Sequence, residues 1–261
     1  MAEISNKGKA LESELEPQRK KEETKIHKMA PLWRWVLTIV AGILLGNVSN
    51  IISGVAASVL AGESGIIFGR FYPMISYSIL RVTIFTFGIK YTWRIVNGGW
   101  KTIGFDFHNW KQDAYYGSAV AIGLAIIQVF VLLPLTGGSQ RSDIIAASEI
   151  MGTSLSTLVA AIILGLAGAL SEELFFRGHI IRSLQGLLGD HRLTLLVSSV
   201  ISITLFGLGH SYQGLSGVLN TVLIASIFTV LFLWRGTLTA GIVAHGVYNT
   251  LAFLGVYFLY T

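Results

Sequence analysis

The chain of 261 residues contains no cysteine and few charged residues. Without cysteine it has no disulfide framework, no thiolate chemistry and no cysteine-ligated metal site. Charged residues make up 13% of the chain, hydrophobic residues make up 52%, and the mean hydropathy is strongly positive. This composition excludes a typical soluble domain and predicts an all-α, polytopic bundle of transmembrane helices in a lipid bilayer. The formal charge of +5 is modest. No segment resembles an RNA- or DNA-binding module, so we expect no nucleic-acid partner.

The first 31 residues differ from the rest because they are polar, rich in Lys and Glu, and contain no apolar run. We expect residues 1–31 to form a polar cytosolic tail. Residues 32–261 then form a transmembrane helical domain, and its functional motifs occupy residues 153–254.

A spanning helix needs roughly 20 apolar residues. Seven segments meet this requirement: 32–52, 66–89, 114–135, 153–170 and beyond, 193–209, 217–234 and 238–260. A further apolar stretch, 51–60, either extends the first span or forms a short eighth one, so we expect seven to eight spanning helices.

Basic residues are concentrated in alternate connections between these spans. One set contains Lys90, Arg94, Lys101, Lys111, Arg177, Arg182, Arg192 and Arg235, whereas the opposite connections contain only Arg70 and Arg141. By the positive-inside rule, this bias predicts a multi-pass protein of the cell membrane with a cytosolic N-terminus.

Three polar clusters interrupt the apolar sequence of the second half. They are Glu172, Glu173 and Arg177, then His210, then His245 and Asn249. A charged side chain inside a bilayer costs several kcal/mol, so an intramembrane carboxylate indicates a function. The simpler alternative is a hydrogen-bond network that only joins helices.

Helix geometry places these clusters at one depth. A turn is expected near residues 189–192, and Glu172 precedes it by about as many residues as His210 follows it. Arg182 and Arg235 mark the cytosolic interface, and Glu172 and His245 lie roughly 15 Å deeper at 1.5 Å per residue. Residues four apart share a helix face, which pairs Glu173 with Arg177 and His245 with Asn249.

These side chains suit the attack of water on an amide carbonyl. A carboxylate beside a neutral histidine can hold and deprotonate a water molecule. An arginine can fix the second carboxylate, and a histidine and an asparagine can donate to an oxyanion. The same set contains possible zinc ligands, namely Glu172, His210 and His245.

The motifs Glu172-Glu173-x-x-x-Arg177, Phe206-x-x-x-His210 and His245-x-x-x-Asn249 together resemble the signature of the CAAX protease and bacteriocin-processing (Abi) family. This family is related to the type II CAAX prenyl endopeptidases. The resemblance implies an intramembrane endopeptidase whose peptide or protein substrate is membrane-associated, lipophilic or prenylated and enters from the membrane or the cytosolic side.

The resemblance also implies roles for the residues. Glu172 and His210 match the water-activating pair, Glu173 and Arg177 the supporting pair, and His245 and Asn249 the oxyanion donors. No His-Glu-x-x-His motif is present, which argues against the better-known zinc signature. We therefore expect a glutamate-type protease that needs no cofactor, with zinc as the alternative.

Three other functions fit parts of the sequence. A non-catalytic immunity or adaptor protein can use the same cavity, and intramembrane carboxylates also serve transporters. Gly214-Leu-Ser216-Gly217 with His245 matches part of the rhomboid serine-protease pattern. Only one span separates this serine from the histidine, so we expect residues 214–217 to form a bend after His210 instead.

Two further polar residues lie outside these motifs. We expect His179 near the membrane interface and Asp113 at the surface.

Overall fold

The structure is a computed structural model that describes residues 30–136, 138–151 and 154–260. The predicted cytosolic tail therefore lies almost entirely outside the described residues. Every regular element in the described part is a helix, and this part contains no strand. The all-α prediction is confirmed.

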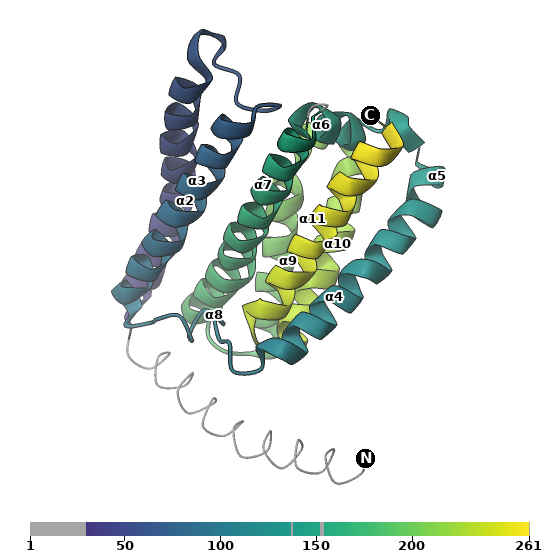
Figure 1. Ribbon diagram of the computed structural model, residues 1–261. Coiled ribbons are helices and arrows are strands. Elements are labelled where there is room, and N and C mark those ends of the chain that lie inside the picture. Colours follow the sequence, from purple (N-terminus) through teal and green to yellow (C-terminus); the bar gives the residue numbers. More distant parts are fainter. Residues whose placement is uncertain (1–29, 137, 152–153, 261) are drawn as a thin grey trace.

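The described part of the chain begins with a helical hairpin (Figure 1). Helix α2 (Leu32–Ala61) and helix α3 (Phe71–Trp93) pack against each other along their length, joined through the short η1 (Gly62–Ser64). Because α2 continues without a break to Ala61, the apolar stretch 51–60 extends the first span and is not an eighth one.

Helix α4 (Trp110–Ile127) follows η2 (Arg94–Val96) and continues through the π-helical η3 (Gln128–Leu132) into α5 (Leu133–Leu135). The short η4 (Gly138–Gln140) leads to α6 (Ser142–Met151), a helix that we did not expect from the sequence. Figure 1 shows α6 beside the end of the bundle where α7 begins.

The remaining helices form the core of the bundle. Helix α7 (Leu155–Glu173) starts at a capping box formed by Ser154 and Thr157 and continues through the π-helical η5 (Leu174–Ile181) into α8 (Arg182–Leu188). The chain then turns into α9 (Arg192–Gly209), η6 (Ser211–Gln213), α10 (Gly214–Arg235) and α11 (Leu238–Tyr260).

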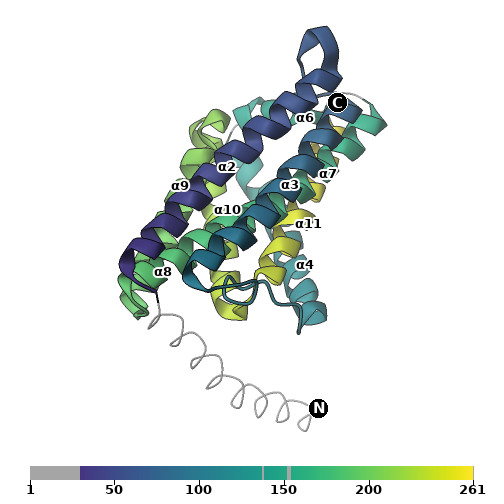
Figure 2. The same ribbon diagram turned by 90° about the vertical axis from the view of Figure 1, so that its left-hand side faces the viewer.

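Helices from both halves of the chain pack around α7. Helix α11 packs against both α4 and α7, while α3 packs against the opposite side of α7. Helices α9 and α10 lie behind this row, as Figures 1 and 2 show from two directions. Helix α7 is therefore central, and the glutamate pair at its end can be reached by side chains from several helices.

Six helical segments in the described part are long and apolar enough to cross a membrane, judged by length and composition. They correspond to α2, α4 with η3 and α5, α7 with η5 and α8, α9, α10 and α11. The seventh predicted span is α3, a 23-residue helix that carries Arg81 and Lys90. The protein is a multi-pass membrane protein.

His179 fixes the α2–α3 hairpin to the core. Its side chain is completely buried within the bundle. The indole Nε1 of Trp93 donates to its Nδ1 at 3.1 Å, and the Phe175 ring stacks on it. The ring faces Gly42 of α2, where a Cβ atom would overlap it.

Asp113 is also buried, contrary to the predicted surface position. Its carboxylate accepts hydrogen bonds from Arg235 and Thr237, both at 2.7 Å. The predicted surface position was wrong because both partners of Asp113 lie where α10 passes into α11, which is far away in the sequence. This ion pair ties the start of α4 to that connection.

The close approach of α2 to His179 can be tested with Gly42→Ala. The added methyl group must displace the imidazole or the helix, so we expect a loss of about 1–3 kcal/mol of stability. The matched control is Gly54→Ala in the same helix, where a Cβ atom meets open space. Thermal unfolding of the purified variants in detergent measures both effects. Equal stability of the two variants would contradict this packing.

Candidate active site

The adjacent glutamates at the end of α7 have different environments. The Glu173 side chain is 0% exposed, whereas that of Glu172 is 20% exposed. Consecutive residues on a helix project roughly 100° apart. Glu173 therefore points into the bundle while Glu172 remains accessible.

Arg177 neutralises the buried glutamate. Its Nη1 donates to Glu173 Oε1 at 3.0 Å, and its Nη2 donates to the Ala225 carbonyl oxygen at 2.8 Å. The Nε group donates to Thr229 Oγ1 at 3.3 Å, and the guanidinium lies 5.0 Å from the centre of the Phe206 ring. A buried charge is tolerated when it is both paired and hydrogen-bonded, and this arrangement meets both conditions.

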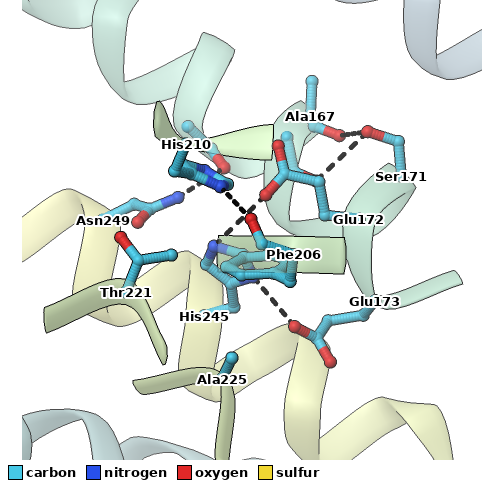
Figure 3. Close-up of polar contacts among 12 residues, drawn as sticks. Ala167, Ser171, Glu172, Glu173, Phe206, His210, Thr221, Ala225, His245 and Asn249 are labelled. Atoms are coloured by element: carbon cyan, nitrogen blue, oxygen red, sulfur yellow. Dashed lines mark hydrogen bonds and ion pairs between the residues drawn. The ribbon is translucent and has the colours of Figure 1, made fainter. Parts of the chain in front are cut away.

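His245 of α11 lies between the two glutamates (Figure 3). Its Nδ1 is 2.9 Å from Glu173 Oε1, and its Nε2 is 3.8 Å from Glu172 Oε2. A carboxylate can only accept, so Nδ1 donates to Glu173. The 3.8 Å separation is too long for a hydrogen bond but short enough for one water molecule to bridge.

His210 follows α9 directly, and a backbone carbonyl orients it. Its Nδ1 is 2.8 Å from the Phe206 carbonyl oxygen, which accepts the hydrogen bond. In a neutral ring this leaves Nε2 as an acceptor. The Phe206 ring packs near both histidines. Its centre is 4.6 Å from that of the His210 ring and 6.0 Å from that of the His245 ring. Within the described residues, no hydrogen bond or ion pair joins His210 directly to Glu172.

Asn249 lies one turn beyond His245 and contacts α7. Its Nδ2 donates to the Gly165 carbonyl oxygen at 3.2 Å. Gly165 permits this approach, because a Cβ atom there would lie 3.2 Å from the Asn249 Cβ. One amide hydrogen is thus used between helices, and the other remains for a ligand.

Sequence reasoning missed Arg81. Its Nη2 lies 3.7 Å from Glu172 Oε1, and its side chain is 22% exposed. An arginine inside the predicted span 66–89 is itself a signal, since charges within spanning segments are rare and functional. The contacts from Ala225 and Thr229 were also missed. One is a backbone carbonyl and the other a hydroxyl among many, so the sequence gives no signal for them.

The rhomboid-like serine does not join the site. Ser216 is exposed near the start of α10, and no hydrogen bond or ion pair connects it to His245 in the described part of the chain. Gly214 adopts a positive φ of 71° as the chain turns from η6 into α10. This is the bend that we expected after His210.

Glu172, His210 and His245 are the zinc ligands that the sequence offers. Across residues 30–136, 138–151 and 154–260, no three His, Cys, Asp or Glu side chains are grouped so that they could hold a metal ion. Glu172, His210 and His245 therefore do not form a ready-made zinc site.

The buried ion pair predicts a specific stability effect. Arg177→Met leaves the Glu173 carboxylate buried without its cation, so we expect a loss of about 3–5 kcal/mol. Arg192→Met, at the exposed start of α9, is the control and should unfold like the wild type. Unfolding in detergent, followed by circular dichroism, measures both.

A second variant separates charge from packing. Adding Glu173→Gln to Arg177→Met removes the uncompensated charge and should recover part of the loss. If Arg177→Met were as stable as Arg192→Met, the ion pair would not hold this part of the bundle together.

Comparison with known proteins agrees with the motifs. Residues 154–251 match the family model described as type II CAAX prenyl endopeptidase Rce1-like. The matched segment contains all three motifs. No curated protein and no solved structure matches the chain. The resemblance expected from the sequence is confirmed: residues 154–251 of the chain are similar to the Rce1-like family of type II CAAX prenyl endopeptidases.

Proposed function

We propose that this protein is an intramembrane endopeptidase that hydrolyses peptide bonds of membrane-associated, lipophilic or prenylated peptides with a glutamate-activated water. The family match supports a membrane protease. The main structural support is the unequal burial of the two glutamates. One is neutralised inside the bundle, and the other is accessible beside a histidine.

Glu172 and His210 form the water-activating pair in this proposal. Glu172 is the accessible carboxylate, and the His210 ring has an acceptor nitrogen when it is neutral. Both groups can accept hydrogens from a water molecule that is about to attack a carbonyl carbon. The water oxygen bonds to that carbon while one water proton moves to Glu172. This proton then passes to the amide nitrogen as the carbon–nitrogen bond breaks.

Glu173 and Arg177 support the reaction without touching the substrate. Arg177 holds Glu173, and Glu173 holds the His245 ring through Nδ1. The Nε2 atom then points to the Glu172 side, where a protonated ring can donate to the oxyanion. The free amide hydrogen of Asn249 supplies a second donor. No step requires a metal ion.

Glu172→Gln keeps the shape of the side chain and removes the base. We expect peptide cleavage to fall by about 10³-fold or more, because a positioned general base contributes roughly 10²–10⁴-fold. The unfolding midpoint should stay at the wild-type value, since Glu172 is partly exposed. Glu149→Gln, in the exposed part of α6, is the matched control.

Comparing membrane peptidomes of cells that express wild type, Glu172→Gln and Glu149→Gln identifies the cleaved sequences. Full cleavage by Glu172→Gln would reject the assignment. A wild-type protein that cleaves nothing but still protects cells from a bacteriocin would favour the non-catalytic immunity function. Cleavage that stops on metal chelation and returns with zinc would reject the metal-free route.

We also propose that the N-terminus is cytosolic and that the membrane is the cell membrane. The α3–α4 and α10–α11 connections lie at one end of the bundle, since the Leu238 amide donates to the Gly104 carbonyl oxygen at 2.7 Å. The basic residues Lys101 and Arg235 belong to these connections, which supports a cytosolic position.

The absence of native cysteine makes this orientation easy to test. A single cysteine at Lys101 should react with an impermeant maleimide only after the membrane is opened. One at Glu63, on η1 at the other end of α3, should react in intact cells. The reverse pattern would contradict the proposed orientation.

A further inference from the structure

Arg81 lies beside the candidate base but outside everything that the family match covers. It belongs to α3, whereas the matched segment is 154–251. Its guanidinium reaches across to α7 and comes within 3.7 Å of Glu172. Arg81 therefore borders the accessible side of Glu172.

The two arginines near the glutamate pair are used differently. Arg177 is 1% exposed and donates three hydrogen bonds within the bundle. Arg81 is 22% exposed, and among the described residues its one polar partner is Glu172, at a distance beyond hydrogen-bond length. A guanidinium has five N–H donors. Arg81 therefore offers a positive charge and unused donors at the accessible edge of the site.

The proposed reaction moves negative charge within reach of these donors. When the water proton moves to Glu172, that carboxylate becomes neutral and the carbonyl oxygen of the substrate becomes an oxyanion. Both events occur around one water molecule held by Glu172. A cation that faces Glu172 in the resting enzyme can then follow the charge to the oxyanion. Interactions that are stronger in the transition state than in the ground state accelerate the reaction.

We propose that Arg81 is a catalytic residue that donates to the oxyanion of the tetrahedral intermediate. This role rests on the proposed hydrolytic function and adds a charged donor to His245 and Asn249. Asn249 already uses one amide hydrogen on Gly165, and His245 is shared between two carboxylates. Of these three groups, Arg81 is the one that has no hydrogen bond within the described part of the chain.

Steady-state kinetics on a peptide that the wild-type protein cleaves test this role with Arg81→Met and Arg81→Lys. Loss of one oxyanion donor typically costs about 10²–10³-fold in kcat. We expect Arg81→Met to show such a loss with a nearly unchanged KM, and Arg81→Lys to keep part of the activity. Lys90→Met removes a cation from the same helix farther along the chain and should behave like the wild type.

Inhibitor binding separates transition-state stabilisation from substrate binding. The probes are a phosphinic peptide, which imitates the tetrahedral intermediate, and a reduced-amide peptide of the same sequence. Arg81→Met should weaken binding of the phosphinic peptide by a factor similar to its loss in kcat. Binding of the reduced-amide peptide should stay within a few-fold of wild type.

Two results would overturn the proposal while leaving the hydrolytic function intact. The first is a raised KM with equal weakening of both inhibitors, which would make Arg81 a substrate-binding residue. The second is an unchanged kcat with a lowered unfolding midpoint, which would make it structural. Absence of cleavage by the wild type would instead reject the hydrolytic function, and the role of Arg81 with it.

Discussion

The hydrogen-bonded ion pair between Glu173 and Arg177 is the interaction on which the site depends. It joins α7 and η5 to α10 through Ala225 and Thr229, and to α11 through His245. Such a pair is costly to bury, and close geometry with additional hydrogen bonds offsets that cost. The packing of these helices is therefore tied to the orientation of one imidazole.

This constraint explains why two neighbouring carboxylates can have different functions. Glu173 is fully enclosed and committed to Arg177 and His245. Glu172 projects roughly 100° around the helix from Glu173, and Arg81 and His245 approach it there without hydrogen-bonding it. The first glutamate organises the site, and the second remains available for a water molecule and a substrate. The π-helical turn η5 begins directly after the pair, consistent with the frequent occurrence of such turns at functional sites.

Much of the fold was predictable because long apolar runs permit little else in a membrane. The seven predicted spans all correspond to helices, and helix geometry predicted that the polar clusters of α7, α9 and α11 lie at one depth. The burial of Asp113 and His179 was not predictable, because their partners, Arg235 and Trp93, are distant in sequence. Hydrophobic periodicity reflects only residues that are close in sequence, so it does not indicate partners that are far away along the chain.

The site was predictable to the extent that its motifs are spaced on single helices. The Glu173–Arg177 pair follows from a four-residue spacing, and the structure contains it. The position of His245 between both glutamates depends on how α11 packs against α7, which spacing does not encode. Arg81 was missed for a different reason. It is a single charge in an otherwise apolar span, outside the motif-bearing half of the chain.

The central claim is that Glu172 activates water and does not itself attack the substrate. Single-turnover hydrolysis in H₂¹⁸O, followed by mass spectrometry of the products and of the peptide containing Glu172, tests it most directly. The account predicts one ¹⁸O atom in the new carboxylate of the cleaved peptide and none in Glu172. Label in Glu172, or a trapped acyl adduct on it, would contradict the account.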